Sequence, residues 1–199
     1  MPRIARFIEP NGFYHIISRA LNETWIFRDN ADFNHFIQLA HTAKEKFPIC
    51  LFHYVLMNTH FHMVLQTSNH AVLSGHIAYL KWHYTMWMRK KYAWRGPLWR
   101  ERYKSLPIEN EDYLYACGMY IEYNPVRAGI CANPADYSYS SFRKYHLGII
   151  DTLIDNYEIS VNLKQSLQLN YSLDITKNIF SLSPAIGSNL FIKKCLSQK

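Results

Sequence analysis

Two strand-like runs of the sequence lie only two residues apart, and this spacing constrains the fold more than any other feature. The runs are ICLFHYVLM (49–57) and HFHMVLQ (60–66), with Asn58 and Thr59 between them. Two residues are enough to join antiparallel strands in a hairpin, whereas parallel strands need a much longer crossover. The sequence therefore predicts an antiparallel hairpin over 49–66.

The segments on either side of this hairpin have alternating strand and helix patterns. Residues 13–19, FYHIISR, are rich in aromatic and β-branched side chains, which favours a strand. Apolar residues recur at helical spacing over roughly 31–46, after the N-cap candidates Asp29 and Asn30. A second apolar stripe predicts a helix over about 73–92.

The region after this second helix completes the pattern. The run LWRERYKSLPI (98–108) favours a fourth strand, and Asn110 is typical of the N-cap of a helix that reaches about Asn124 and ends before Pro125. The resulting order is β-α-β-β-α-β-α. Its first six elements match the split βαβ plan, which predicts an α+β, ferredoxin-like fold with an antiparallel sheet and helices packed on one face.

Length and composition indicate one compact unit with a C-terminal addition. A chain of 199 residues is about one domain, and 49% apolar against 19% charged residues excludes global disorder. The short connections end near residue 148, so we expect a unit over 1–148 and an appendage of unknown role over 149–199. No apolar stretch is long enough to span a membrane, and no secretory signal is evident, so we expect a cytoplasmic protein with reduced cysteines.

The basic charge of the chain is concentrated in one window. The net charge is +7, and residues 81–104 alone hold eight basic residues against one acidic residue, together with seven aromatic residues. Aromatic rings stack on bases while cations hold the phosphate backbone, so this window predicts a surface for single-stranded nucleic acid. The alternative is an amphipathic helix with a solvated basic side. The candidate DNA-binding residues in the window are Arg95, Arg100, Arg102 and Lys104, the last three alternating on the predicted fourth strand.

Two groups of polar residues could form a chemical site. His60 and His62 alternate on a predicted strand, so both rings project from one side of the sheet and could share a metal ion. Tyr120 and Asn124 lie one turn apart on one stripe of the predicted last helix. Each group also has a structural interpretation, as packed histidines and as a packed tyrosine whose hydroxyl finds a partner.

Four segments resemble a known family when they are taken together and in order. They are LMNTHFHMVL (56–65), WRERYKS (99–105), YIEYNPVRAG (120–129) and DYSYSSF (136–142). Over about residues 1–146 the chain resembles single-tyrosine HUH transposases, and within them the REP-associated tyrosine transposase branch of the insertion-sequence-200-like family. The resemblance implies that the unit over 1–148 is a catalytic domain of this kind.

The resemblance also implies a mechanism and its residues. Such proteins cleave and rejoin single-stranded DNA beside hairpins, and a tyrosine becomes joined to a 5′-phosphate. By position, His60, His62 and Asn124 match the ligands of a divalent metal, Mg²⁺ or Mn²⁺, and Tyr120 matches the catalytic nucleophile. The alternative nucleophiles are Tyr113 and Tyr123, and Arg127 is a candidate for DNA contact or for the end of the helix.

The implied partner is single-stranded DNA with a hairpin structure. Members of the wider family often dimerise, so a homodimer is one possibility and a monomer the other. Two rival functions remain at this point: a non-catalytic ferredoxin-like module that binds single-stranded nucleic acid, and a metal-dependent hydrolase in which water attacks. The rivals differ from the transposase hypothesis in that neither forms a covalent bond between protein and DNA.

Overall fold

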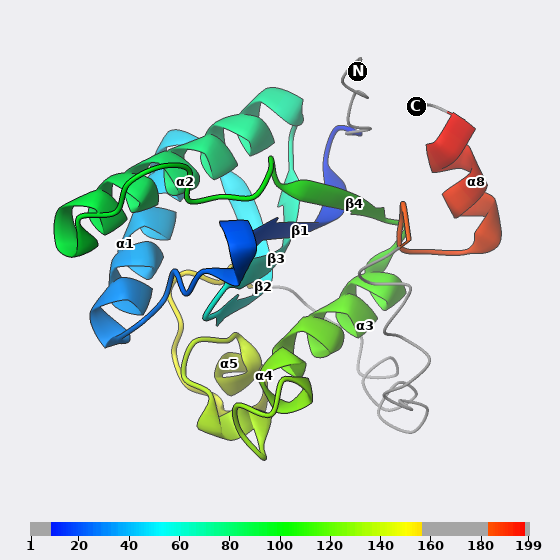
Figure 1. Cartoon of the computed structure of the whole chain (residues 1–199). Helices are drawn as coiled ribbons and strands as arrows, with labels where there is room; N and C mark the ends of the chain where they lie inside the picture. Colours follow the sequence, from blue (N-terminus) through cyan, green and yellow to red (C-terminus); the bar gives the residue numbers. More distant parts are fainter. Residues whose placement is uncertain (1–8, 157–182, 198–199) are drawn as a thin grey trace.

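A four-stranded antiparallel sheet forms the centre of the molecule, as the computed structural model shows for residues 9–156 and 183–197 (Figure 1). The strands are β1 (Gly12–Arg19), β2 (Ile49–Met57), β3 (His60–Thr67) and β4 (Lys104–Ile108), in the spatial order β2-β3-β1-β4. The predicted hairpin is β2–β3, turned by Asn58 and Thr59. The α+β, ferredoxin-like fold predicted from the order of elements is confirmed.

The pleat of the sheet divides the core into two layers. On one face, α1 (Asn30–Lys46) and α2 (His70–Tyr92) cover a cluster that includes Ile16 and Phe61. On the other face, α3 (Glu111–Glu122) covers Ile17 of β1 and Val64 of β3. Side chains alternate along these strands, so Ile17 points away from the face that holds Ile16, and Val64 away from the face that holds Phe61. Figure 1 shows α1 and α2 on one side of the sheet and α3 on the other. The helices of the split βαβ unit thus share one face, and the other face is left for α3.

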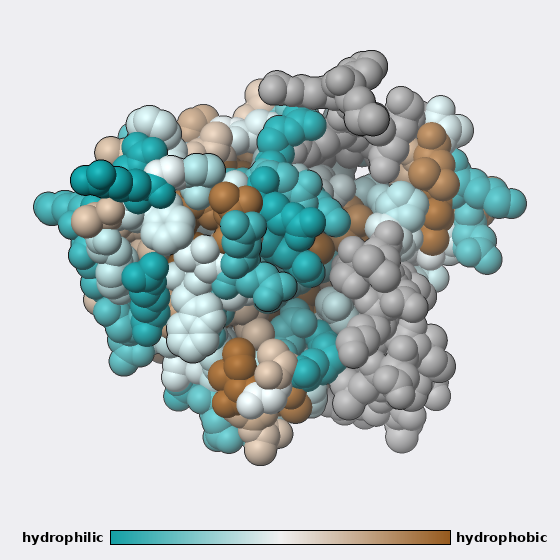
Figure 2. All heavy atoms as spheres, viewed as in Figure 1, coloured by the Kyte–Doolittle hydropathy of each residue, from teal (hydrophilic) through white to brown (hydrophobic). Residues whose placement is uncertain are grey.

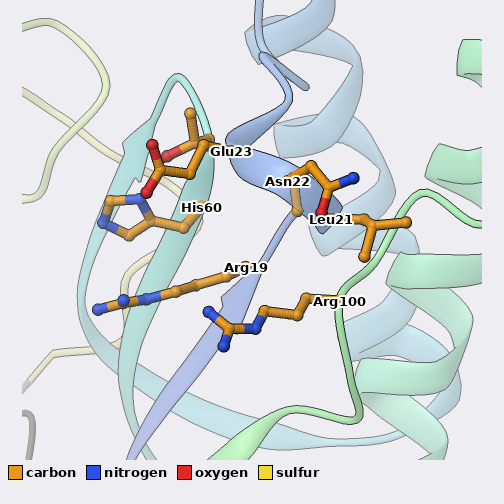
Figure 3. A pocket seen from close by; sticks show the side chains of 8 residues that line it. Arg19, Leu21, Asn22, Glu23, His60 and Arg100 are labelled. Carbon is orange, nitrogen blue, oxygen red and sulfur yellow. The ribbon is translucent and has the colours of Figure 1, made fainter.

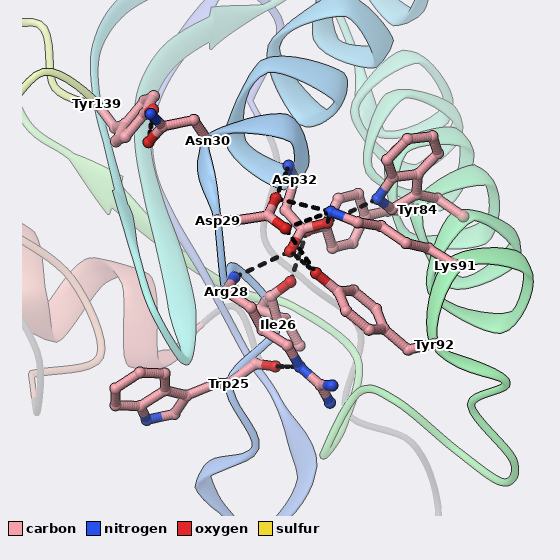
Figure 4. Close-up of polar contacts among 11 residues, drawn as sticks. Trp25, Ile26, Arg28, Asp29, Asn30, Asp32, Tyr84, Lys91, Tyr92 and Tyr139 are labelled. Carbon is pink, nitrogen blue, oxygen red and sulfur yellow. Dashed lines mark hydrogen bonds and ion pairs between the residues drawn. The ribbon is translucent and has the colours of Figure 1, made fainter.

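A buried carboxylate joins α1 to α2. Asp32 accepts hydrogen bonds from the Trp87 indole at 2.9 Å, the Lys91 ammonium at 2.9 Å and the Tyr92 hydroxyl at 2.7 Å, and from the backbone N–H of Arg28 at 3.0 Å. Figure 4 shows Lys91 and Tyr92 pointing toward it. Every oxygen of this buried carboxylate is therefore compensated, as burial of a charge requires.

The fourth strand is shorter than the sequence predicts. Only Lys104–Ile108 forms β4, whereas residues 98–108 were expected to be extended. Before it, Trp99 makes a single bridge to Ala20 and the chain then bends. Because Leu98 and Tyr103 are buried at the two ends of this bend, the backbone follows their packing and not the ladder. Arg100 and Arg102 therefore do not lie on one strand face with Lys104, and that part of the prediction is wrong.

The end of α3 also differs from the prediction. The helix ends at Glu122, but Pro125 does not stop the helical path, because α4 (Asn124–Arg127) follows at once with the proline in its first turn. A proline fits there because its missing N–H has no partner to lose in a first helical turn. Gly129, with φ of 68°, follows this turn in the left-handed conformation that suits a glycine after a helix.

The segments after α5 (Phe142–Leu147) pack against the sheet unit. Leu153 and Ile154 are buried in the cluster beneath α1 and α2. Further on, Ile186 pairs with β4 through hydrogen bonds to Pro107 and Glu109, and α8 (Asn189–Ser197) follows. Within the described ranges, no helix is both long and apolar enough to cross a membrane.

Candidate active site

The two histidines of the H-x-H motif lie side by side on the face of the sheet that α3 covers. His62 lies opposite Ile17 of β1 and Val55 of β2, and His60 lies opposite Arg19 and Met57. The centres of the two imidazole rings are 5.0 Å apart. The predicted common face is therefore present, at the end of β3 next to the hairpin turn.

His62 is held by a third histidine from β1. Its Nδ1 shares a hydrogen bond of 2.8 Å with Nε2 of His15, and the two rings are stacked. His62 is 2% exposed, and burial, followed by the proximity of His15 and His60, holds its pKa well below the usual range. The ring is therefore neutral, which is the form that binds a metal, and its Nε2 is left for a ligand.

His60 is oriented by the residue before it. The hydroxyl of Thr59 and Nδ1 of His60 are 2.9 Å apart. Burial, and to a lesser extent the charge of Arg19, lowers the pKa of His60 to about 4. Both histidines of the motif are thus neutral near pH 7, and each has its Nδ1 in contact with a polar neighbour.

Arg127 connects the tyrosine and the asparagine of the YIEYNPVRAG motif. Its Nη2 donates to the backbone carbonyl of Tyr120 and, at 2.8 Å, to Oδ1 of Asn124. Its guanidinium also lies over the Tyr120 ring, 4.1 Å from the centre. α3 ends at Glu122 and α4 begins at Asn124, and the arginine links Tyr120 to Asn124 across this junction.

The packing of α3 and α4 brings this group to the histidines. Tyr120, 6% exposed, packs in the same cluster as Ile17 and Val55, the two residues that flank His62 across the sheet. The structure therefore brings His60, His62, Tyr120 and Asn124 to one face.

A buried contact between Glu122 and His53 fixes α3 over β2. Glu122 of α3 lies 2.8 Å from Nδ1 of His53 and accepts a hydrogen bond of 2.5 Å from the hydroxyl of Ser141. Burial alone would raise the pKa of Glu122, but His53, His146 and Ser141 outweigh it and lower the pKa to about 2. Gly118, one turn before, lets the His53 ring approach the helix, since a Cβ there would lie 2.5 Å from the ring.

The positions of the five candidate DNA-binding residues differ. Arg100, Arg102 and Lys104 line a small pocket together with Arg19, and Arg100 also lines a larger one beside His60. Arg95 is exposed in the connection between α2 and β4, and it lines neither pocket. Figure 2 shows the molecule from the same side as Figure 1, and on this side hydrophilic residues gather over the middle of the surface, where β1 and β4 lie.

Sequence reasoning missed two residues of the site, His15 and Arg19. Both belong to the strand predicted over 13–19, where they alternate with Ile17 and so share its face. That alternation was visible in the sequence. The register that sets His15 against His62 depends on pairing with a strand 47 positions later, which no local pattern specifies.

Comparison with known families fits this geometry. A sequence model described as "Transposase IS200 like" matches residues 10–124, more than half of the chain. The chain belongs to the IS200-like transposase family. The resemblance inferred from the motifs is thereby confirmed, and the matched region of this transposase runs from β1 to Asn124.

A solved structure shares the fold of this transposase. It is described as a REP-associated tyrosine transposase bound to a REP hairpin; it has a TM-score of 0.64 and 16% identity, over 80% of this chain and 96% of that one. A second, described as a transposase of Deinococcus radiodurans, has a TM-score of 0.42 and 17% identity, over 61% and 96% of the two chains. No curated protein matches the sequence.

Proposed function

We propose that this transposase cleaves and rejoins single-stranded DNA beside a hairpin through a covalent phosphotyrosine at Tyr120. The observation that carries the proposal is the Arg127 clamp, which holds Tyr120 and Asn124 on the face that carries His60 and His62. The hairpin is the partner bound in the solved REP-associated relative, which supports the same partner class here.

The proposed step is a transesterification without an external energy source. The Tyr120 hydroxyl loses its proton, and its oxygen forms a bond to phosphorus while the bond from phosphorus to the 3′-oxygen breaks. The leaving 3′-oxygen takes up a proton, and the 5′-phosphate remains on the tyrosine as a phosphodiester. One phosphodiester bond breaks and one forms, so the bond energy is retained in the link to tyrosine. A DNA 3′-hydroxyl can therefore attack this link, reverse the step and rejoin the strand.

The residues present fit a divalent metal. His60 and His62 are neutral imidazoles on one face, and the third candidate ligand is Oδ1 of Asn124, which Arg127 orients through a hydrogen bond. No group of three or more His, Cys, Asp or Glu side chains in the described ranges forms an alternative metal site. Mg²⁺ or Mn²⁺, when bound, acts as a Lewis acid on the scissile phosphate.

The arginine-rich surface beside His60 is the proposed path of the DNA backbone. Arg100, Arg102 and Lys104 are exposed and reach the small pocket that Arg19 shares, so they provide a phosphate-binding patch next to the site. Arg95 is placed further along the same basic window. Arg127 is engaged within the site, so we assign it to positioning Tyr120 and Asn124 in addition to any contact with DNA.

A covalent adduct assay tests the proposal. The wild-type protein and Tyr120→Phe are incubated with labelled single-stranded hairpins from the DNA that flanks the gene, with Mg²⁺ or Mn²⁺. We expect label that migrates with the wild-type protein on a denaturing gel and that disappears in Tyr120→Phe or after metal chelation. Tyr113→Phe and Tyr123→Phe serve as matched controls and retain the adduct.

The outcomes separate the rival functions. DNA binding without an adduct on any hairpin or with either metal would overturn the proposal in favour of a binding module. Cleavage that leaves a free 5′-phosphate without an adduct would indicate attack by water. An adduct that survives in Tyr120→Phe but is lost in Tyr113→Phe or Tyr123→Phe would move the nucleophile along the helix.

A further inference from the structure

A cavity of about 620 Å³ lies directly beside His60. Its walls come from three parts of the chain: the end of β1 with the short helix η1 (Leu21–Glu23), which brings Arg19, Asn22 and Glu23; the start of β3, which brings His60; and the bend before β4, which brings Arg100. Figure 3 shows these side chains arranged around one space. The volume lies in the range of pockets that hold small organic ligands, roughly 300–1,000 Å³.

The backbone of η1 is strained at two of the residues that line the cavity. Asn22 and Glu23 have φ angles of 50° and 53°, in the left-handed region that favours glycine. Strain of this kind persists only where the surroundings impose it, and it is concentrated at ligand-binding sites. Here the surroundings are hydrogen bonds from the N–H of Ala20 and of Leu21 to Thr59 and Leu98, which fix the start of the turn.

The charged groups around the cavity do not neutralise one another. Among the described residues, the structure gives no ion pair or hydrogen bond to the side-chain head groups of Arg19, Glu23 or Arg100, and all three are exposed. Two arginines and one carboxylate therefore stand in one cavity with their hydrogen-bonding groups available. A ligand that carries both a phosphate and a hydrogen-bond donor edge complements this set.

We propose that this cavity binds one unpaired guanine nucleotide of the DNA strand next to the cleaved phosphate. This inference rests on the proposed function and deepens it. Arg19 and Arg100 hold the backbone phosphate, while Asn22 and Glu23 contact the edge of the base. The nucleotide adjoins the reaction because His60 forms part of the same cavity wall.

The choice of guanine follows from donor and acceptor chemistry. A carboxylate can only accept hydrogen bonds, and guanine is the base whose Watson–Crick edge offers it two neighbouring donors, N1–H and the N2 amino group. The amide of Asn22 can donate to O6 on the same edge. Unstacked bases are commonly recognised through this edge once they have left the helix.

A binding selection tests the cavity without any covalent step. A pool of hairpins with randomised single-stranded flanks is selected on the Tyr120→Phe protein in Mg²⁺, and the bound DNA is sequenced. We expect guanine to be enriched about tenfold at one flanking position, the effect of a hydrogen bond to a charged group. Adding Glu23→Gln removes this enrichment, whereas Glu45→Gln, an exposed acid of α1 outside the cavity, leaves it unchanged.

Inosine provides a second measurement at the selected position. It lacks the N2 amino group of guanine, so the substitution weakens binding to the Tyr120→Phe protein and has little further effect when Glu23→Gln is present. Absence of any base preference, or a guanine preference that survives Glu23→Gln, would overturn the proposal. Loss of the adduct with an intact guanine preference would instead count against the catalytic proposal and leave the cavity standing.

Discussion

The guanidinium of Arg127 lies 4.1 Å from the centre of the Tyr120 ring and covers it. The same group donates to the carbonyl of Tyr120 and to Oδ1 of Asn124, so one side chain spans the break between α3 and α4. A cation over an aromatic face is favourable, and a planar guanidinium can make this contact and two hydrogen bonds at once. The geometry of Tyr120, the proposed nucleophile, therefore depends on a residue seven positions away.

Replacing Arg127 should impair the reaction more than the fold. We expect Arg127→Ala to slow adduct formation by about 10- to 100-fold, the usual cost of losing a group that orients the reacting residues or metal ligands. Arg127→Lys should recover little, because an ammonium cannot reproduce the planar contact. Rates from single-turnover adduct assays check this, with exposed Arg89→Ala on α2 as the control. An unchanged rate in Arg127→Ala would contradict the positioning role.

His15 should control metal affinity through His62. Its removal takes away the hydrogen bond to Nδ1 of His62, and we expect His15→Ala to raise the metal concentration needed for half-maximal adduct formation about 10- to 100-fold. His15→Gln, which can keep a hydrogen bond, should recover part of this loss. A Mn²⁺ titration of the adduct rate measures the effect, and equal titration curves for wild type and His15→Ala would refute it.

Gly118→Ala should destabilise the protein although alanine is the better helix former. The added Cβ would lie 2.5 Å from the His53 ring, so α3 must move or His53 must leave Glu122. We expect a loss of about 1–3 kcal/mol in the free energy of unfolding, as for overpacking in a core. Urea unfolding measures this loss. Ala116→Gly, at a half-buried position on α3, is the comparison for helix propensity alone, with an expected cost of about 1 kcal/mol.

Asp32 should make stability depend on acid pH. Burial by itself raises the pKa of Asp32, but hydrogen bonds from Lys91, Trp87 and Tyr92 outweigh it and lower the pKa below that of an ordinary aspartate. A carboxyl whose pKa is lower in the folded state stabilises the fold above its unfolded pKa of about 3.9, and the contribution is lost as the pH falls through the folded pKa. Urea unfolding from neutral pH downward should therefore show a decline below about pH 4.

Asp32→Asn separates this carboxylate from other acid effects. The variant keeps the size of the side chain but loses its charge, so we expect a loss of about 1–3 kcal/mol at neutral pH, because donors from α2 lose a charged acceptor. The stability difference from wild type should then shrink on acidification. A difference that stays constant down to low pH would show that the charge of Asp32 is not responsible.

The sequence by itself determined the elements whose signals are local. The two-residue spacing between the strand-like runs led to the hairpin β2–β3, because only an antiparallel connection is that short. Alternation placed His60 and His62 on one face, and Asn110 marked the start of α3 by capping the N–H of Tyr113 at 3.1 Å. Each of these inferences depends on residues within one turn or one strand of each other.

Tertiary structure alone decided how these elements meet. The bend over 98–103 follows from burial of Leu98 and Tyr103, and it separates Arg100 and Arg102 from β4. His15 reaches His62 through strand pairing across 47 positions. The cavity beside His60 combines the end of β1 with η1, the start of β3 and the bend before β4, which come from three separate parts of the sequence. Register and packing are set by the sum of many distant contacts, so no local pattern encodes the residues that surround the histidines.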